Sequence, residues 1–297
     1  MGARFRYFKE HKNDFDTIFI GSSRIQNHLI PQQFDAHNSA HGVVTHSFNL
    51  GYAGMWPPES FYFLREVLAL RPAKLRWAVI ELMDYRFGEL ERNPFTSRAV
   101  YWHDWQHTCM AWRLIVESPL PLNEKCQELA LHTSLYLRRL TNAGRGAEWL
   151  RFPFASGRPK EDTGWMKRGG FDPAAEMGSW TDAALADYAR QVAAVRDSLP
   201  PRTARPGFSD ALRSLLKDLQ EAGVEPIFVI SPTVRSDENL LLGLPDGLTV
   251  FAFNQPAEFP QLFEAVNHVE PRHLNEKGAR EFTRLFAERF SNHVSRP

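Results

Sequence analysis

The chain has 297 residues, enough to bury a substantial core in one large domain or two smaller ones. With 43% hydrophobic and 24% charged residues, its composition is that of an ordinary globular protein. Lys and Arg together number 35, as do Asp and Glu, so the formal net charge is zero and no overall field favours nucleic acid or an anionic membrane.

Residues 1–16 form a basic, aromatic stretch that lacks the apolar core of a signal peptide. No run approaches the roughly eighteen uninterrupted apolar residues of a membrane helix. We therefore expect neither an export signal nor a membrane span in these residues, and the localisation stays open. Membrane association through a segment absent from this chain also stays open, because such a stretch can follow a membrane anchor.

Residues 15–94 alternate short apolar runs with a helical pattern. The runs at 15–21, 46–51 and 76–82 predict strands. Between the last two, a proline start precedes four residues that share one helical face: Phe61, Leu64, Val67 and Leu68. Strand, helix and strand in this order predict a parallel sheet with crossover connections.

Residues 95–206 interrupt the alternation, since they combine helical stretches with irregular ones rich in Trp, Arg, Pro and Gly. We interpret them as an insertion or lid within one α/β domain that spans 1–297. Its cysteines, Cys109 and Cys126, are expected to be free thiols, although their spacing does not fix their distance. We expect the insertion to pack over or beside the site, with tryptophans as an apolar or sugar-stacking wall: Trp102, Trp105, Trp112, Trp149, Trp165 and Trp180.

From about residue 207 the alternation returns. Ser209 is expected to cap a helix that Gly223 ends and that carries an apolar face: Leu212, Leu215, Leu216 and Leu219. Apolar runs at 224–233 and 248–254 predict strands, and apolar positions from Leu274 to Phe290 predict a final helix. The predicted fold class is α/β, a three-layer sandwich with a mostly parallel, flavodoxin-like sheet and a helical or irregular insertion.

Two adjacent serines, Ser22 and Ser23, follow the first predicted strand at Gly21. A serine at a strand-to-helix turn either caps the helix or serves as a nucleophile, because the N–H groups of the helix start are free. A nucleophilic serine needs a base. Near the C-terminus Glu270 stands three positions before His273, so it can accept the proton of one ring nitrogen and leave the other facing a hydroxyl. Ser23, His273 and Glu270 thus supply the members of an acyl-transfer triad.

These stretches resemble the sequence blocks of the SGNH, or GDSL-type, hydrolase superfamily. "FIGSSR" is similar to its first block, in the form of a bacterial branch with Gly-Ser-Ser, and maps the nucleophile onto Ser23. "EPRHLNEKGAREFT" is similar to its last block, Asp-x-x-His before a C-terminal helix, with Glu270 in place of the aspartate and His273 as the base. "FNLGYAGM" resembles its second block, which implies that the N–H groups of Ser23 and Gly51 hold an oxyanion, with Gly54 a weaker choice.

The third block departs from the family's pattern. The family has Gly-x-Asn-Asp after a central strand, with the asparagine donating to the oxyanion, whereas "VIELMDYRF" has Met83 there. Methionine cannot donate, and the loss of one donor lowers the rate by roughly a hundredfold to a thousandfold. Either Ser22, Asn49 or another side chain fills the gap, or activity is weak or absent. The candidates for substrate contact are Arg24, Asn49 and Asp84.

Other histidines give weaker signals for a metal. His103 and His107 are one helical turn apart beside Asp104 but lack a third ligand, and the aromatic residues among them favour packing. A second group lies in a predicted loop: His37, His41 and His46. No Gly-rich phosphate loop is present. We therefore expect no metal and no cofactor.

The resemblance implies a serine-dependent esterase or O-acyltransferase that acts on an ester-linked acyl group, often acetyl in this superfamily. Members of the similar bacterial branch are often membrane-anchored and tied to cell-surface acylation. This implies an extracytoplasmic location and an acylated small molecule or carbohydrate as substrate, including a cell-surface glycan. No nucleic acid is expected as a partner. The alternative, which Met83 favours, is a catalytically silent SGNH-like domain that binds a glycan or a protein of an envelope assembly.

Overall fold

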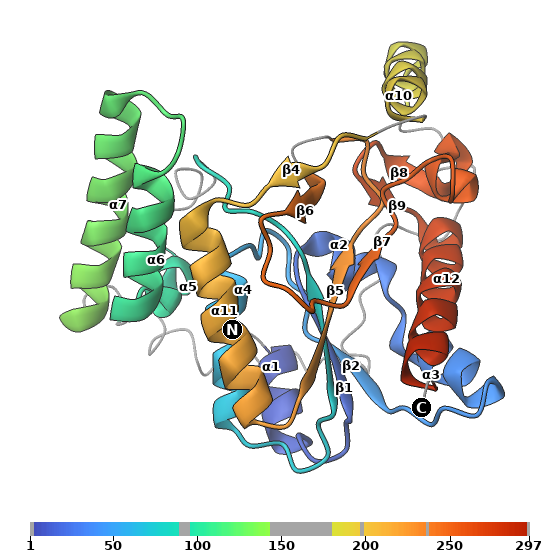
Figure 1. Ribbon diagram of the computed structural model, residues 1–297, viewed down its shortest axis with the longest axis horizontal. Coiled ribbons are helices and arrows are strands. Elements are labelled where there is room, and N and C mark those ends of the chain that lie inside the picture. Colours follow the sequence, from blue (N-terminus) through green and yellow to red (C-terminus); the bar gives the residue numbers. More distant parts are fainter. Residues whose placement is uncertain (1–2, 89–95, 143–179, 197–198, 236–237, 296–297) are drawn as a thin grey trace.

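The computed structural model describes residues 3–88, 96–142, 180–196, 199–235 and 238–295. At its centre is a five-stranded sheet in which every neighbouring pair of strands is parallel. The strand order is β2-β1-β3-β5-β7 (Figure 1), formed by β1 (Thr17–Ile20), β2 (Ser47–Asn49), β3 (Trp77–Glu81), β5 (Glu225–Ile230) and β7 (Val250–Ala252). All five strands lie in the apolar runs predicted to form them. Because helices flank this sheet, the predicted α/β class is confirmed.

Alternate side chains of each strand enter two separate apolar cores, one on each face of the sheet. Along β1, Ile18 and Ile20 enter one core and Phe19 enters the other. The register places Phe19 beside Val79 of β3, which lies beside Ile227 of β5. Burial of both faces is what an all-parallel sheet between two helical layers requires.

Each core is covered by its own helices, which lie on opposite sides of the sheet in Figure 1. The first core receives α1 (Ala3–Glu10), α4 (Glu59–Ala69), α6 (Trp105–Val116) and α11 (Pro206–Glu221). The second core receives α2 (Ser23–His28), α3 (Pro31–Ala40) and α12 (Glu276–Val294). One stripe of α12 is fully buried there, and its members are Phe282, Phe286 and Phe290. The chain therefore forms the three layers that the sequence predicts.

The helix before β5 differs from its prediction at one end. It begins at Pro206, where proline costs no hydrogen bond, so the prediction that Ser209 caps it is wrong. Ser209 lies inside the helix and its hydroxyl donates to the carbonyl of Gly243 at 2.5 Å. Gly223 ends the helix as predicted, with φ of 69° and its N–H bonded to Gln220.

The predicted insertion is mostly helical where the structure describes it. It contains α5 (Ser97–Trp102), α6, α7 (Leu122–Leu140) and α10 (Asp182–Val195). Figure 1 shows α5, α6 and α7 beside α11, on the side away from α12. Met110, Leu114 and Ile115 of α6 belong to the first core, so this part of the insertion shares the core of the sheet. Cys109 and Cys126 are both unpaired.

Short elements complete the described chain. β4 (Arg202–Thr203) pairs with β6 (Leu240–Leu242). After β7, two short 3-10 helices, η3 (Pro260–Phe263) and η4 (Ala265–Asn267), lead into a hairpin of β8 (His268–Glu270) and β9 (His273–Leu274). Leu274, expected in the final helix, lies in β9 instead, because α12 begins only after Asn275, its N-cap.

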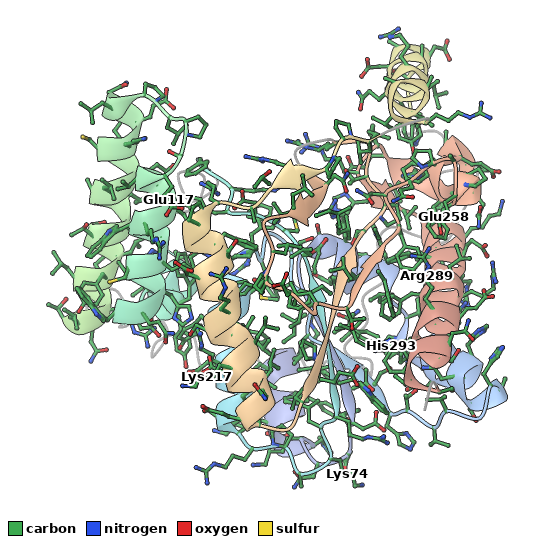
Figure 2. All side chains as sticks on the ribbon, in the orientation of Figure 1. Lys74, Glu117, Lys217, Glu258, Arg289 and His293 are labelled. Carbon is green, nitrogen blue, oxygen red and sulfur yellow. The ribbon has the colours of Figure 1, made fainter. Side chains whose placement is uncertain are left out.

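Many charged side chains lie on the outside of these layers (Figure 2). Lys217 projects from the rim of the molecule, while Arg289 and His293 of α12 pair with Glu258 and Glu225 (Figure 2). Such surface pairs contribute at most about 1 kcal/mol each, so the layers depend mainly on their apolar cores. Within the described ranges, no helix is long and apolar enough to cross a bilayer.

Candidate active site

The turn between β1 and α2 gives its two serines different surroundings. Ser22 is the N-cap of α2, and its hydroxyl accepts the N–H of Arg24 at 3.2 Å. Ser23 is the first helical residue and its hydroxyl has another partner. A Cβ at Gly21 would lie 2.5 Å from Cβ of Glu81, so only glycine lets β1 turn this close to β3. Ser22 therefore caps the helix and leaves the Ser23 side chain available.

Ser23, His273 and Glu270 form a continuous hydrogen-bonded chain. Oγ of Ser23 lies 2.7 Å from Nε2 of His273, although the residues are 250 positions apart. Nδ1 of His273 lies 2.5 Å from Oε1 of Glu270. Since a carboxylate only accepts, a neutral His273 carries its proton on Nδ1 and accepts the Ser23 hydroxyl proton at Nε2. The prediction that these three side chains meet is confirmed, and the arrangement is able to move a proton from the hydroxyl to the ring.

The β8–β9 hairpin holds the carboxylate and the imidazole side by side. Glu270 ends β8, His273 begins β9, and the two residues are paired directly in the antiparallel ladder. The side chain of His273 is 13% exposed and that of Glu270 is 40% exposed. The ring is therefore mostly enclosed, while the carboxylate lies at the solvent edge of the site.

Helix α2 connects the serine to this hairpin through His28 at its other end. Nε2 of His28 accepts the N–H of Leu274, the residue after His273, at 3.0 Å. The rings of His28 and His273 meet edge to face with centroids 5.8 Å apart. The hydroxyl of Thr283 in α12 donates to the carbonyl of His28 at 2.9 Å. One short helix thus fixes the backbone positions of both Ser23 and His273, and the sequence carried no signal that singled out His28.

Behind the serine turn lies a buried network of charged side chains centred on Arg24. Nε of Arg24 donates to Glu81 at 2.9 Å and Nη1 donates to Glu238 at 2.5 Å. Glu81 also accepts the N–H of Ser22 at 2.6 Å, and Glu238 also accepts from Arg86. Positive and negative side chains alternate in this network, and their attraction offsets the free-energy cost of removing each charge from water.

The pKa shifts follow from burial and from these pairings. Burial lowers the pKa of Arg24, but the carboxylates of Glu238 and Glu81 outweigh it and raise that pKa well above its usual range. Burial raises the pKa of Glu238, but Arg24 and Arg86 outweigh it and hold that pKa below its ordinary value. Both groups therefore stay charged at neutral pH.

This network changes the expectations for Arg24 and Met83. Arg24 is 8% exposed and its guanidinium already bonds two carboxylates, which argues against the predicted substrate contact. Met83 is 4% exposed, and its sulfur accepts from Nη2 of Arg24 at 3.3 Å. Met83 therefore packs against the network and supplies no donor to an oxyanion.

Asn49 and Gly51 also have partners within the protein. The amide nitrogen of Asn49 donates to the carbonyls of Ile25 and Leu29, both at 2.8 Å, and its oxygen accepts the N–H of Gly51 at 2.9 Å. Asn49 is fully buried. A Cβ at Gly51 would lie 2.6 Å from the backbone nitrogen of Gln26. These two residues pack the loop after β2 against α2, so a role in substrate or oxyanion binding would require Gly51 to exchange its acceptor.

Asp84 is bonded within the protein, whereas the N–H of Ser23 is not bonded in the described chain. Asp84 pairs with Arg205 at 2.5 Å and with Arg202 at 4.0 Å, and its side chain is 7% exposed. Its carboxylate is therefore bonded inside the protein, which argues against the predicted substrate contact. Across the described chain, no acceptor takes the N–H of Ser23. Of the two N–H groups expected to hold an oxyanion, that of Gly51 is bonded to Asn49 and that of Ser23 is not bonded within the described residues.

One end of the insertion lies beside the hairpin. Trp180 donates to the carbonyl of His268 at 3.4 Å, and the hydroxyl of Tyr188 in α10 lies 3.0 Å from Nε2 of His268. Burial lowers the pKa of His268 to about 4, so this ring is neutral at physiological pH. Trp180 thus contacts the hairpin that carries Glu270 and His273, whereas Trp102, Trp105 and Trp112 belong to α5 and α6, which lie beside α11 (Figure 1). Trp149 and Trp165 lie outside the described residues.

Two of the histidines considered as metal ligands, His103 and His107, bond to protein groups. His103 bonds to the carbonyl of Ala99 and to His132. His107 bonds to Asp104 at 2.7 Å and to Arg65 at 2.9 Å. The second group was expected in a loop, but His37 lies in α3, and its ring stacks on that of His41, the residue that caps the end of this helix. Among the residues that the structure describes, no group of His, Cys, Asp and Glu side chains is placed to hold a metal ion.

Comparisons with known proteins do not assign the chain to a family. The chain matches no protein-family model, and a search of curated proteins finds no match to it.

Replacement of His28 should test its hold on the β8–β9 hairpin. His28→Ala leaves the buried N–H of Leu274 without its acceptor, which should lower the free energy of unfolding by about 1–3 kcal/mol. His28→Gln should recover part of this loss, because its side-chain oxygen reaches about as far as Nε2. Denaturant unfolding measures both variants. Equal losses in the two would contradict the proposed hydrogen bond.

Acid titration should reveal the Arg24–Glu238 pair. Because the folded pKa of Glu238 lies below its ordinary value of 4.5, its stabilising effect is complete above pH 4.5 and disappears as the pH falls through the folded pKa. Glu238→Gln should cost about 3 kcal/mol at neutral pH, and the wild-type and variant stabilities should converge in acid. The control is Glu221→Gln, at a side chain that is 66% exposed. Parallel pH curves for wild type and Glu238→Gln would refute the pairing.

Proposed function

We propose that the protein is a serine-dependent esterase or O-acyltransferase of the SGNH type that its sequence blocks resemble. The observation that supports the proposal is the hydrogen-bonded chain from Ser23 through His273 to Glu270. Ser23 directly follows a central parallel strand, at the edge where open α/β sheets build their binding sites. The three residues stand in the roles of nucleophile, base and orienting carboxylate.

In the proposed reaction, Oγ of Ser23 attacks the carbonyl carbon of an ester while its proton passes to Nε2 of His273. Glu270 accepts from Nδ1 and stabilises the imidazolium. When the tetrahedral intermediate collapses, the carbon–oxygen bond to the alcohol breaks and the alcohol leaves with the proton from His273. Water or an acceptor hydroxyl then attacks the acyl-serine by the same steps. Hydrolysis and acyl transfer differ only in this second nucleophile.

Stabilisation of the intermediate would depend first on the N–H of Ser23. Gly51 could contribute only by releasing its N–H from Asn49, and Met83 contributes no donor. One lost donor costs roughly a hundredfold to a thousandfold in rate. We therefore expect a lower turnover number than that of a site with three oxyanion donors.

An acylated carbohydrate is the proposed substrate class. The backbone N–H of Tyr52 donates to the carbonyl of Gly21 at 2.9 Å, which ties an aromatic residue that is 44% exposed to the serine turn. The guanidinium of Arg98 lies over the Tyr52 ring, 4.5 Å from its centroid. Arg4 also lies over this ring, 5.6 Å from its centroid. The part of the Tyr52 side chain that the two guanidinium groups leave exposed, together with those polar groups, suits the mixed apolar and hydroxyl surface of a sugar.

The second candidate is a catalytically silent domain that binds a glycan or an envelope protein. The observation that favours it is the shortage of free oxyanion donors. The N–H of Gly51 is bonded to Asn49, and Met83, which has no donor, stands where the family has an asparagine. A silent domain retains the hydrogen-bonded triad without forming an acyl-serine. Labelling of the serine distinguishes the two candidates.

Ser23 should react with a fluorophosphonate probe. Ser23→Ala should abolish labelling and lower kcat/KM toward an aryl acetate by about a thousandfold or more. Ser22→Ala is the matched control, because its hydroxyl caps α2 and faces Arg24, so it should keep its label. Mass spectrometry of the labelled peptide identifies the residue. An unlabelled wild-type protein that is folded by circular dichroism would reject the enzyme proposal in favour of the silent domain.

Glu270→Gln should lower kcat by about a hundredfold or more while KM and stability change little. The amide keeps a hydrogen bond to the ring but favours the wrong tautomer of His273. Glu288→Gln is the control, at a side chain of α12 that is 50% exposed and pairs with Arg284, and it should behave as wild type. Near wild-type kcat for Glu270→Gln would remove Glu270 from the proposed triad while leaving Ser23 and His273 in place.

A further inference from the structure

Four buried side chains of the insertion and of the loop after β3 form one hydrogen-bonded cluster, which the proposed function does not use. Its members are His103, which follows α5, His132 and Glu128 of α7, and Tyr85, which follows β3. Both histidines are 0% exposed, Glu128 is 4% exposed and Tyr85 is 8% exposed. These groups therefore bond to one another rather than to water, and each hydrogen bond between them needs a proton of its own.

The protons of the two histidines follow from a backbone carbonyl at one end of the cluster. Nδ1 of His103 lies 2.5 Å from the carbonyl oxygen of Ala99, which only accepts, so Nδ1 carries a proton. Burial lowers the pKa of His103 well below its ordinary value, so this ring is neutral and its Nε2 is an acceptor. That Nε2 lies 2.9 Å from Nδ1 of His132, which therefore carries a proton as well. The charge of His132 then depends on its own Nε2.

The hydroxyl of Tyr85 takes part in two hydrogen bonds but has one proton. Its oxygen lies 2.6 Å from Nε2 of His132 and 3.2 Å from Oε2 of Glu128. Burial and the charge of Glu128 raise the pKa of Tyr85 well above its ordinary value, so the phenol keeps its proton. That proton fills one of the two bonds, and the other needs a proton from His132 or Glu128. The cluster therefore holds one proton more than neutral imidazoles, a phenol and a carboxylate supply.

The bonds of Glu128 place this additional proton on His132. Oε1 of Glu128 accepts the N–H of Gly88 at 2.7 Å, as a carboxylate oxygen does. Burial raises the pKa of Glu128, but its interactions with His132 and Gly88 outweigh burial and hold that pKa below its ordinary value. The carboxylate then lies 3.7 Å from Nε2 of His132. Opposite charges this close in a buried site stabilise each other.

Three other charged groups act on the cluster from the elements packed around it: Asp104 before α6, Arg139 of α7 and Arg205 before α11. Asp104 bonds to His107, and Arg205 pairs with Asp84. Within the described ranges, none of the three forms a hydrogen bond with a member of the cluster. The additional proton is therefore held by the cluster's own groups.

We propose that His132 is an imidazolium bonded through Tyr85 to the Glu128 carboxylate, so that the attachment of α7 to the loop after β3 requires one bound proton. Loss of this proton leaves two acceptors to share the single phenol proton in a site that excludes water, which weakens the attachment. The cluster is thus a pH-sensitive link between the insertion and the sheet. The proposal is independent of the activity of Ser23.

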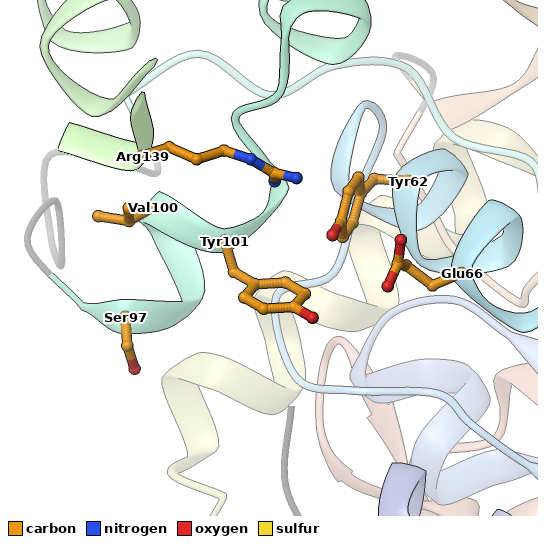
Figure 3. A pocket seen from close by; sticks show the side chains of 6 residues that line it. All are labelled: Tyr62, Glu66, Ser97, Val100, Tyr101 and Arg139. Carbon is orange, nitrogen blue, oxygen red and sulfur yellow. The ribbon is translucent and has the colours of Figure 1, made fainter. Parts of the chain in front are cut away.

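The helices that this cluster joins also line a cavity of about 230 Å³ between α4, α5 and α7. Figure 3 shows Val100 of α5 and Arg139 of α7 on one side of it and Tyr62 of α4 on the other. Because the cluster holds α7 against the loop after β3, it also helps to position one wall of this cavity. Loss of the proton is therefore expected to act on the cavity as well.

Nitrogen NMR of the full chain tests the charge on His132. With isotope-labelled histidine, assigned through His132→Gln, both ring nitrogens of His132 should carry protons, and His103 should be neutral with its proton on Nδ1. A histidine with an ordinary pKa of roughly 6.5 is about nine-tenths neutral at about pH 7.5, so the same protein unfolded in urea at that pH is the reference. A neutral His132 ring in the folded protein under these conditions would overturn the proposal.

Glu128→Gln should remove the need for the additional proton. The amide nitrogen of this variant donates to the oxygen of Tyr85 and its oxygen accepts the N–H of Gly88, so the phenol proton fills the bond to His132. The variant should therefore fold with a neutral His132. Glu124→Gln, at an exposed position of α7, is the control and should keep the imidazolium. An imidazolium that persists in Glu128→Gln, or one that disappears in Glu124→Gln, would contradict the pairing.

The pH dependence of stability tests the consequence for the fold. Above about pH 7.5 an unfolded histidine has released its proton, whereas the folded cluster keeps it, so stability falls as the pH rises until the cluster also releases the proton. The folding equilibrium constant of the wild type should fall by up to about tenfold per pH unit relative to that of Glu128→Gln. Denaturant unfolding from about pH 7.5 to about pH 9 measures this ratio. A ratio that stays constant over this range would show that folding takes up no proton there and would reject the pH-sensitive link.

Discussion

The geometry around Ser23 depends on one buried carboxylate, Glu81, at the end of β3. It accepts the N–H of Ser22 at 2.6 Å and Nε of Arg24 at 2.9 Å, so both neighbours of Ser23 are tied to the same group. An anion that is 3% exposed needs paired positive charge, which Arg24 supplies and which Glu238 then balances. The serine turn is therefore fixed by the central strand beside it as well as by its own capping residue.

A second constraint, helix α2, positions the imidazole of His273 relative to Ser23. Ser23 opens α2 and His28 ends it, and His28 holds the backbone next to His273. Because both contacts belong to one six-residue helix, the geometry of that helix sets the distance between its two ends. The second core keeps the helix in place, since Ile25 and Leu29 are fully buried against α12 and the sheet. Proximity between residues 250 positions apart thus results from packing rather than from a local motif.

The insertion joins the core through polar groups as well as apolar ones. His103 bonds to His132 at 2.9 Å, His132 bonds to the hydroxyl of Tyr85 at 2.6 Å, and Glu128 accepts the N–H of Gly88 at 2.7 Å. The side chains of this cluster are buried, and such a network favours one arrangement over others because each broken bond is costly. It gives α5 and α7 a defined position after β3, and the cavity beside Arg139 lies between these helices and α4.

Apolar periodicity is a local property of the chain, so the sequence by itself predicted the strands, the α/β class and a mostly parallel sheet. The order of its sequence blocks also predicted that Ser23, His273 and Glu270 meet, although the packing of distant segments is what brings them together. It did not determine that α11 begins at Pro206, since a serine and a proline both suit a helix start. Only the tertiary structure decided the surroundings of Arg24, Asn49 and Gly51, whose partners come from other segments. A polar side chain near a turn is compatible with solvent, substrate or an internal partner, and burial selects the internal partner because an unpaired polar group there is unfavourable.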